Sequence, residues 1–227
     1  MEEEVIKDYS RNITRDITSN SVLTRVFFKM FTGLLLSAVI AWYAYSSGLY
    51  LTLNYTMLAV LEIVVVLLFS FLSKKLPAAV VNGLFYVYSL INGLTLGVIF
   101  AVYDMPSISL AFVGAAVLFG GLGTYGYVTK RDLSKFGTIL MWTLIAGIVV
   151  SIVNIFLQNS FVDLAINWVM LFVFCGLTAF DLQKVKYVEE YQDQLDMDKI
   201  HVYLAMELYL DFINIFLRLL SLTGKRK

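Results

Sequence analysis

Long apolar stretches alternate with short polar ones from residue 22 to the end of the chain. Each apolar stretch is close to the length of about 20 residues that an α-helix needs to cross hydrocarbon roughly 30 Å thick. Most of the polar connections are short, so consecutive helices should be antiparallel neighbours in one bundle. The pattern predicts an all-α polytopic membrane protein with seven spans, at residues 22–45, 51–72, 76–102, 108–128, 136–157, 161–180 and 202–222.

Three segments fall outside this pattern. Residues 1–21 are polar and acidic, and we interpret them as a cytoplasmic N-terminal tail before a membrane domain at 22–222. Residues 181–200 are polar enough to be either a solvated loop or a frayed helical extension. Residues 223–227 form a short basic C-terminal tail. One domain accounts for everything after the first 20 or so residues.

The distribution of Lys and Arg orients the predicted bundle. Basic residues occur before the first span and after the second, fourth and sixth, whereas the alternate loops "SSG", "YDMPS" and "QNS" contain none. Because cytoplasmic loops are enriched in Lys and Arg, this contrast predicts a cytoplasmic N-terminus. A seventh full span would place the final "GKRK" outside. We favour seven spans, with a last helix that returns inward as the alternative.

Composition supports the membrane assignment and excludes other classes. Of 227 residues, 59% are hydrophobic and 15% charged, where a soluble domain has about 25% charged residues. Formal net charge is zero, which argues against nucleic acid as a partner. The fragment "GLGTYG" matches a dinucleotide fingerprint by letter, but it follows an apolar helix, so close helix packing explains it better. For the acids of 181–200, which lack the spacing of a calcium loop, a solvated face is the default interpretation.

The last span carries an unusual number of polar side chains. Glu207, Asp211, Asn214 and Arg218 follow one another at intervals of 4, 3 and 4 residues, which places them on one helical stripe. A charged side chain at mid-bilayer costs roughly 2.5 to 3.5 kcal/mol on an insertion scale. Such a stripe must therefore face protein or a wet cavity, and the C-terminal helix is predicted to be central.

Two further acids need partners. Glu62 lies in the middle of "AVLEIVVV", where an apolar helix offers no local cation, and Arg218 is the partner we expect for it. Asp181 ends the sixth span, and can reach the depth of Asp211 if that helix runs on or the next one begins early. The plainer alternative pairs Asp181 with Lys184 at the surface and neutralises Asp211 with Arg218. The residues alone leave both interpretations open.

Several motifs resemble the transmembrane Bax inhibitor motif family, the Bax inhibitor-1-like membrane proteins. They are "NGLTLG", "GTYGYVTKRDLS", "AFDLQKVK" and "LYLDFINIFLRLL". The resemblance implies a seven-helix bundle with a central C-terminal helix, a hydrogen-bonded aspartate pair that senses pH, and calcium leak as the activity. Matching the motifs carries the pair onto Asp181 and Asp211, and a basic latch residue onto Lys74 or Lys75. Where family members often have arginine, this chain has Ser221.

The implied pair has a simple physical basis. Two carboxyl groups that share a site cannot both ionise cheaply, so they would share a proton, and their charge state would bias helix packing. Once ionised, Asp181 and Asp211 would attract a hard divalent cation such as Ca²⁺. The resemblance to the family implies calcium as the transported ion, and it implies no other cofactor. The candidate charge partners of the pair are Lys184, Arg218, Glu62 and Glu207.

Two rival functions were weighed against calcium leak. An intramembrane aspartyl protease would need a Gly-x-Gly-Asp motif and a Pro-Ala-Leu motif, and both are missing, so we do not expect an enzyme. The alternative function is a regulatory membrane protein that binds and restrains a partner, such as a membrane protease or a cell-death factor. In a bacterium the expected location is the inner membrane, with the lipid bilayer as the constant partner.

Overall fold

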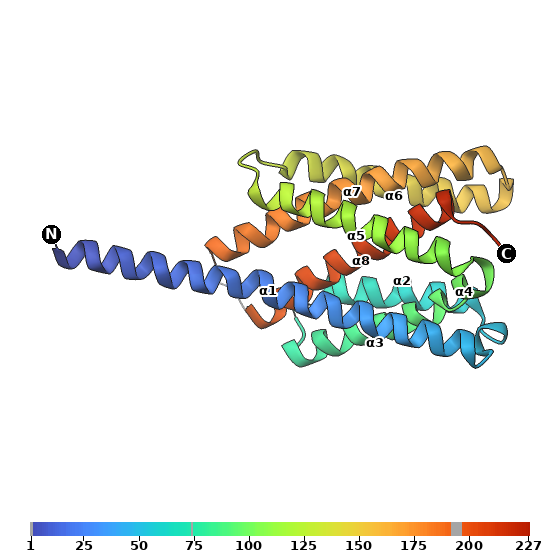
Figure 1. Ribbon diagram of the computed structural model, residues 1–227, viewed down its shortest axis with the longest axis horizontal. Coiled ribbons are helices and arrows are strands. Elements are labelled where there is room, and N and C mark those ends of the chain that lie inside the picture. The colour runs from blue at the N-terminus through green and yellow to red at the C-terminus, as the bar shows by residue number, and fades with distance from the viewer. Residues whose placement is uncertain (1, 74, 192–196) are drawn as a thin grey trace.

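The computed structural model describes residues 2–73, 75–191 and 197–227, and for residues 2–21 and 72 it describes the backbone alone. Seven long helices and two short helical turns follow one another in the described part of the chain (Figure 1). They are α1 (Glu2–Ser46), η1 (Leu49–Leu51), α2 (Tyr55–Leu72), α3 (Ala78–Leu96), α4 (Ile99–Val102), α5 (Met105–Val128), α6 (Ser134–Leu157), α7 (Ser160–Glu190) and α8 (Met197–Thr223).

The predicted number of helices is confirmed. Within the residues that the structure describes, six helices are long and apolar enough to cross a membrane. The remaining one, α2, has 18 residues, which is near the lower limit of about 17 for a span. Two helices run further than their apolar parts: α1 begins at Glu2, and α7 continues to Glu190. The first half of residues 181–200 is therefore a helical extension, as one of the two interpretations expected.

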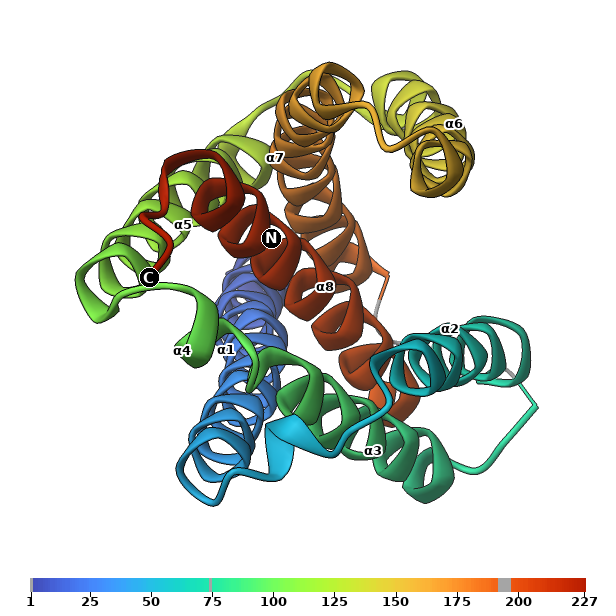
Figure 2. The same cartoon turned by 90° about the vertical axis from the view of Figure 1, so that its right-hand side faces the viewer.

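α8 is the most buried of the candidate membrane spans. This helix packs against α1, α3, α5 and α7, while α2 lies outside against α3 and α6 lies outside against α7 (Figure 2). In α8, 67% of the residues in its apolar stretch are buried, against 11 to 44% in the other five candidate spans. A helix with ionisable groups is stable in a membrane when protein covers it, and α8 has that cover.

Polar caps set the start of the helices at one end of the bundle. The side chain of Asn54 accepts a hydrogen bond from the backbone N–H of Met57 at the start of α2. Asp104 does the same for Ser107 at the start of α5, and Asn159 accepts from two N–H groups at the start of α7. Such caps satisfy backbone donors that a helix leaves unpaired in its first turn.

Glycines allow α5 and α7 to approach closely. A Cβ atom on Gly126 would collide with the backbone of Ala179, and a Cβ atom on Gly123 would press on the Leu182 side chain. Both glycines belong to the "GLGTYG" fragment, so the interpretation of this fragment as a close helix-packing surface is confirmed. The contact also fixes the position of the segment of α7 that carries Asp181.

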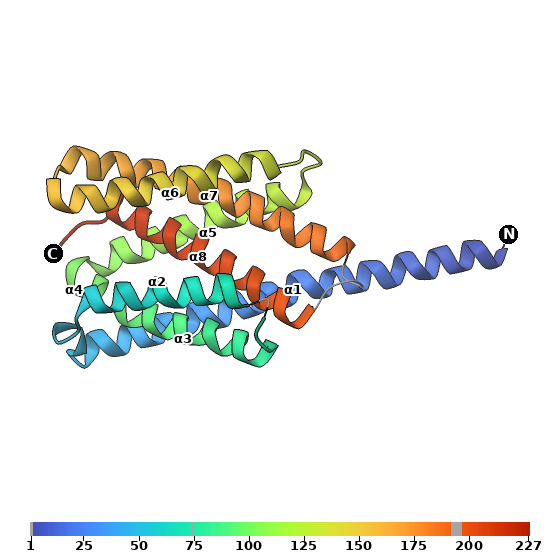
Figure 3. The same ribbon diagram turned by 180° about the vertical axis from the view of Figure 1, so that it is seen from behind.

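The C-terminal tail lies at the opposite end of the bundle from the N-terminus (Figures 1 and 3). α8 is one continuous helix of 27 residues and does not turn back. Beyond it, the backbone N–H of Lys227 donates to the Val102 carbonyl at 2.9 Å, and the N–H of Asp104 donates to the Lys225 carbonyl at 3.2 Å. These contacts place the tail beside the turn between α4 and α5, which argues against the re-entrant alternative.

Candidate functional site: an acid cluster between α7 and α8

A lysine bridges two acids at the interface of α7 and α8. The Nζ atom of Lys184 lies 2.8 Å from the Asp181 Oδ1 atom on its own helix and 2.8 Å from the Glu207 Oε1 atom on α8. The side chain of Asp181 is only 8% exposed and that of Glu207 19%, so neither ion pair is a surface contact. The same ammonium group lies 4.7 Å from the centre of the Phe180 ring.

Asp211 completes the cluster from α8. Its side chain is buried, and its carboxyl group is in hydrogen-bonding contact with that of Asp181. The Oδ2 atom of Asp211 and the Oε2 atom of Glu207 are buried without a hydrogen-bond partner among the described residues. The structure thus brings together the two aspartates that sequence reasoning paired.

The extensions of α7 and α8 explain why the two aspartates meet. Asp181 follows the last residue of the predicted sixth span, yet α7 continues for nine residues beyond it, to Glu190. α8 begins at Met197, five residues before the apolar stretch that was expected to start the helix. Both conditions for a common depth are therefore met.

A cavity of about 280 Å³ adjoins the cluster. Its walls come from α2, α6, α7 and α8, and the polar side chains in them are Asp181, Glu207, Asp211, Tyr203 and Ser70. Apolar residues form the remainder, among them Phe69, whose ring stacks on that of Tyr203. Acids with unpaired oxygen atoms thus face a cavity large enough for water and small cations.

The charges of the cluster do not balance when all groups are ionised. Asp181, Glu207 and Asp211 would carry three negative charges against the one positive charge of Lys184. Burying an uncompensated charge is expensive, and carboxyl groups in contact respond by sharing a proton. Among the described residues, no group of three or more His, Cys, Asp or Glu side chains has an arrangement that would hold a resident metal ion. The cluster is thus a chargeable site, whose net charge depends on protons.

The predicted pair between Glu62 and Arg218 is wrong. Glu62 accepts a hydrogen bond from the Thr95 hydroxyl at 2.7 Å, because α2 packs against α3. Arg218 donates from its Nη1 atom to Asn167 on α7 at 2.8 Å, because the polar stripe of α8 faces α7. For the same reason Arg218 does not neutralise Asp211, which lies seven residues, or roughly 10 Å, back along the helix.

A neutral hydrogen-bond network on the other face of α8 escaped sequence reasoning. The fully buried hydroxyl of Tyr209 contacts the Ser37 hydroxyl at 2.7 Å and donates to the Asn92 Oδ1 atom at 3.0 Å. Ser37 also lies 2.6 Å from the Ser89 carbonyl oxygen. Asn92 lies in "NGLTLG" and Tyr209 in "LYLDF", so the quoted motifs held the signal, but no periodicity within one helix links them.

The remaining predicted residues are an acid of the segment 181–200 and the two candidate latch lysines. The default interpretation, that the acids of 181–200 form a solvated face, is wrong for Glu189. This side chain is buried, and it accepts hydrogen bonds from the Leu23 N–H and the Tyr127 hydroxyl. This occurs because the last turn of α7 packs against α1 and α5. Lys75 is exposed between α2 and α3. Lys74, the other latch residue, lies outside the described residues, so the latch stays a prediction.

Fold and site together define a class: a multi-pass α-helical membrane protein with a chargeable acid cluster inside its bundle. The family model for the inhibitor of apoptosis-promoting Bax1 matches residues 19–227. The chain is 41% identical over 214 residues to inner membrane protein YbhL of Escherichia coli strain K12, which covers 90% of this chain and 92% of that one. The chain belongs to the Bax inhibitor-1 family, as its motifs indicated.

More distant relatives extend over the same length. An uncharacterized protein of Borreliella burgdorferi is 34% identical over 220 residues, covering 93% of this chain and 94% of its own. An uncharacterized membrane protein of Streptococcus pyogenes serotype M1 is 30% identical over 219 residues, which cover 92% of this chain and 95% of that protein. The similarity therefore includes the whole membrane domain.

Proposed function

We propose that this protein is a pH-sensitive calcium-leak channel or transporter of the bacterial inner membrane, oriented with its N-terminus in the cytoplasm. The observation that carries the proposal is the contact between the Asp181 and Asp211 carboxyl groups at the wall of a cavity. Membership of the family supports calcium leak as the activity, since the resemblance of the motifs implied it. The alternation of Lys and Arg supports the orientation.

The proposed gate is the interface of α7 and α8. A proton shared by Asp181 and Asp211 lets their carboxyl groups hydrogen bond across this interface. Loss of the proton leaves two negative charges in contact, and their repulsion favours a different packing of the helices. The ionised carboxylates would also offer oxygen ligands to a passing Ca²⁺ ion. Lys184 limits the charge that the cluster can accumulate.

The test is calcium flux from vesicles that contain the purified full-length protein. We expect flux in the wild type to vary between about pH 6 and 8, the range expected for a proton shared by buried acids. Asp181→Asn and Asp211→Asn should each flatten this dependence, and the double variant should add little to either one, because the titration belongs to the pair.

Asp163→Asn is the matched control for this test. Asp163 lies in the first turn of the same helix, where it accepts a hydrogen bond from Asn154 at 2.6 Å, far from the cluster. This variant should keep the pH profile of the wild type. Additive effects of the two cluster substitutions, or a normal profile in Asp181→Asn, would falsify the shared-proton gate.

A second candidate is the regulatory role, in which the protein binds and restrains a membrane partner. It is favoured by the N-terminal part of α1, which extends as a helix beyond the bundle (Figure 1). Deleting residues 2–20 should abolish such binding and leave calcium flux intact. Absence of flux from wild-type vesicles at every pH would favour this role over the leak.

A further inference from the structure

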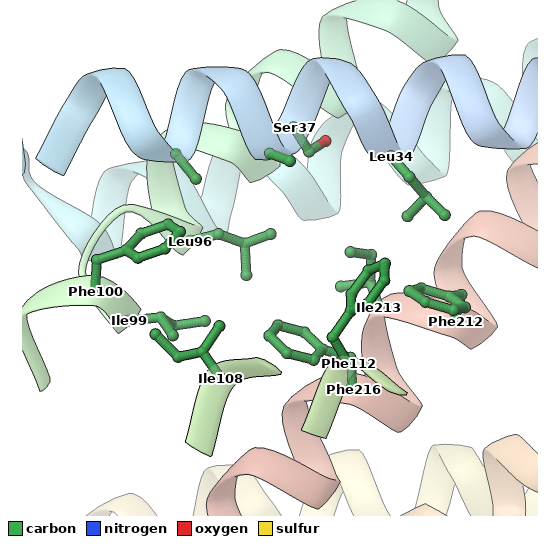
Figure 4. Close-up of a pocket in the computed structure, with 12 residues that line it drawn as sticks. Leu34, Ser37, Leu96, Ile99, Phe100, Ile108, Phe112, Phe212, Ile213 and Phe216 are labelled. Carbon is green, nitrogen blue, oxygen red and sulfur yellow. The ribbon is translucent and has the colours of Figure 1, made fainter. Parts of the chain in front are cut away.

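A second cavity lies among apolar side chains that point toward one another from several helices (Figure 4). None of the acid-cluster residues lines it. It has a volume of about 130 Å³ and is lined by residues of α1, α3, α4, α5 and α8. All but one of the residues that line it are apolar: Leu34, Ala38, Ala41, Leu96, Ile99, Phe100, Ile108, Phe112, Phe212, Ile213 and Phe216. The exception is Ser37.

The lining excludes water and favours hydrocarbon. The hydroxyl of Ser37 already contacts the Tyr209 hydroxyl and the Ser89 carbonyl, so it is not an open partner for a water molecule. A cavity without polar partners stays dry. Left empty, its walls would forfeit the dispersion contacts that a close-packed interior makes. A saturated hydrocarbon chain would restore those contacts without leaving any polar group unpaired.

The cavity reaches the outer surface of the bundle through the seam between α1 and α5. Ala38 on α1 and Phe112 on α5 line the cavity, and both are exposed. The seam is bridged toward the N-terminal end of the bundle by an edge-to-face contact of Phe27 with Phe119, whose ring centres are 6.2 Å apart. This surface belongs to membrane-spanning helices, so the surroundings at the seam are lipid chains.

The C-terminal tail places fixed cations beside this cavity. The Nζ atom of Lys227 donates to the carbonyl oxygen of Phe100, a residue of the cavity wall, at 2.8 Å. The backbone N–H of Lys227 donates to the Val102 carbonyl, and that of Lys225 donates to the Ser107 hydroxyl at 2.9 Å. The tail therefore does not swing freely, although its three basic side chains are exposed.

Aromatic rings and one acid complete the surroundings of the tail. The guanidinium of Arg226 lies 6.0 Å from the centre of the Tyr103 ring, and the ammonium of Lys227 lies 5.7 Å from that of Tyr45. Such rings are typical of the boundary between membrane and water. Hydrogen bonds from Ser107 lower the pKa of Asp104, which stays ionised and offsets part of the positive charge. The three basic side chains outnumber this one carboxylate.

We propose that the cavity and the basic tail at 225–227 form a binding site for one anionic phospholipid. One acyl chain enters through the seam and fills the apolar cavity, and the phosphate of the headgroup lies against the exposed basic side chains of the tail. Charge complementarity selects an anionic lipid, because Lys and Arg side chains at a membrane surface attract anionic headgroups. On the proposed orientation, the lipid belongs to the outer leaflet.

The test measures lipid retained by the purified full-length protein, by native mass spectrometry with phosphatidylglycerol or phosphatidylcholine of identical chains. The wild type should retain phosphatidylglycerol at least roughly five-fold better, the preference expected from one cation at a membrane surface. Replacing Lys225, Arg226 and Lys227 by Gln should remove this preference. The same replacement of the exposed Lys130, Arg131 and Lys135 at the other end is the control and should preserve it.

The role of the cavity is tested separately, by placing a large side chain at its exposed edge. Ala38→Phe should abolish retention of both lipids, whereas Val39→Phe, one residue on and outside the lining, should change neither. Equal retention by these two variants would overturn the site, as would a wild type that retains both lipids equally. A lipid-free wild type that dimerises through α1 and α5 would overturn it in favour of a subunit interface. Calcium flux is not a readout here, so failure of the gate would leave this result unaffected.

Discussion

The two faces of α8 bury polar groups in opposite ways. Toward α7, Glu207 and Asp211 form part of a charged cluster that has unpaired oxygen atoms and borders a cavity. Toward α1 and α3, Tyr209 joins a network of hydroxyl, amide and carbonyl groups whose hydrogen bonds are short and mutual. Because neutral groups are fully satisfied by fixed partners, the second face stabilises one packing. The first face consists of ionisable groups, and it is the face on which the proposed pH-sensitive gate rests.

The strongest test of this contrast removes Lys184, the cation that contacts the acid cluster in the described part of the chain. Lys184→Leu leaves Asp181 and Glu207 without their common partner. Deleting one member of a buried ion pair costs about 3 to 5 kcal/mol, and we expect about 3 kcal/mol because the lysine is partly exposed. Unfolding in detergent measures the loss. Lys186→Leu is the control, because Lys186 lies two residues further along α7, on a different face, and its described hydrogen bond is a long one of 3.3 Å to the Thr129 carbonyl. It should lose much less.

A smaller loss is expected on the neutral face. Tyr209→Phe removes one hydroxyl and leaves the Asn92 Oδ1 atom without its donor in a buried site, while Ser37 keeps the Ser89 carbonyl. An unsatisfied buried polar group costs about 1 to 3 kcal/mol. The pH profile of calcium flux should keep its shape, which a separate flux measurement checks. A flattened profile in this variant would erase the distinction between the two faces.

Arg218→Met tests how far the charged face extends along α8. The described hydrogen bond of Arg218 goes to Asn167 and not to an acid of the cluster, so its removal should cost about 1.5 kcal/mol, the lower end for a bond from a charged group. Thermal unfolding in detergent provides the comparison with Lys184→Leu. If Arg218→Met and Lys184→Leu lost equal stability, Arg218 would have to be regarded as a member of the acid cluster.

The smallest effect is expected from Glu62→Gln. The amide oxygen can accept the same hydrogen bond from Thr95, so the change in unfolding free energy should remain below about 1 kcal/mol. Glu62→Leu, which removes the acceptor, should be the more damaging substitution of the two. Comparing the unfolding of both variants separates the loss of a hydrogen bond from the loss of a charge.

Sequence reasoning succeeded where the evidence lay within one helix. The apolar lengths predicted seven helices, and the spacing of Glu207, Asp211 and Arg218 placed them on one stripe, which the structure turns toward α7. The pairing of Asp181 with Asp211 came from the resemblance to a family. Its plainer rival was also partly right, since Lys184 does bind Asp181 while Asp211 contacts the same carboxyl group.

Sequence reasoning failed where the outcome depended on how helices rotate against one another. Glu62 was assigned to Arg218 because a buried acid needs a partner, but α2 faces α3, where Thr95 provides a hydroxyl. The network around Tyr209 joins residues 37, 92 and 209, and no local spacing connects positions so far apart. Intervals of three and four residues define a face of a helix, but they do not determine which neighbour covers it.

The glycine contact between α5 and α7 has a mechanical consequence. With backbone against side chain at Gly123 and backbone against backbone at Gly126, these helices leave each other almost no freedom to slide. The interface of α7 with α8, by contrast, is held near Asp211 by ionisable side chains. On the proposed gate, a rearrangement that starts there would move α8 against the pair formed by α5 and α7. These two helices would be the stationary part of the bundle, and α8 the moving part.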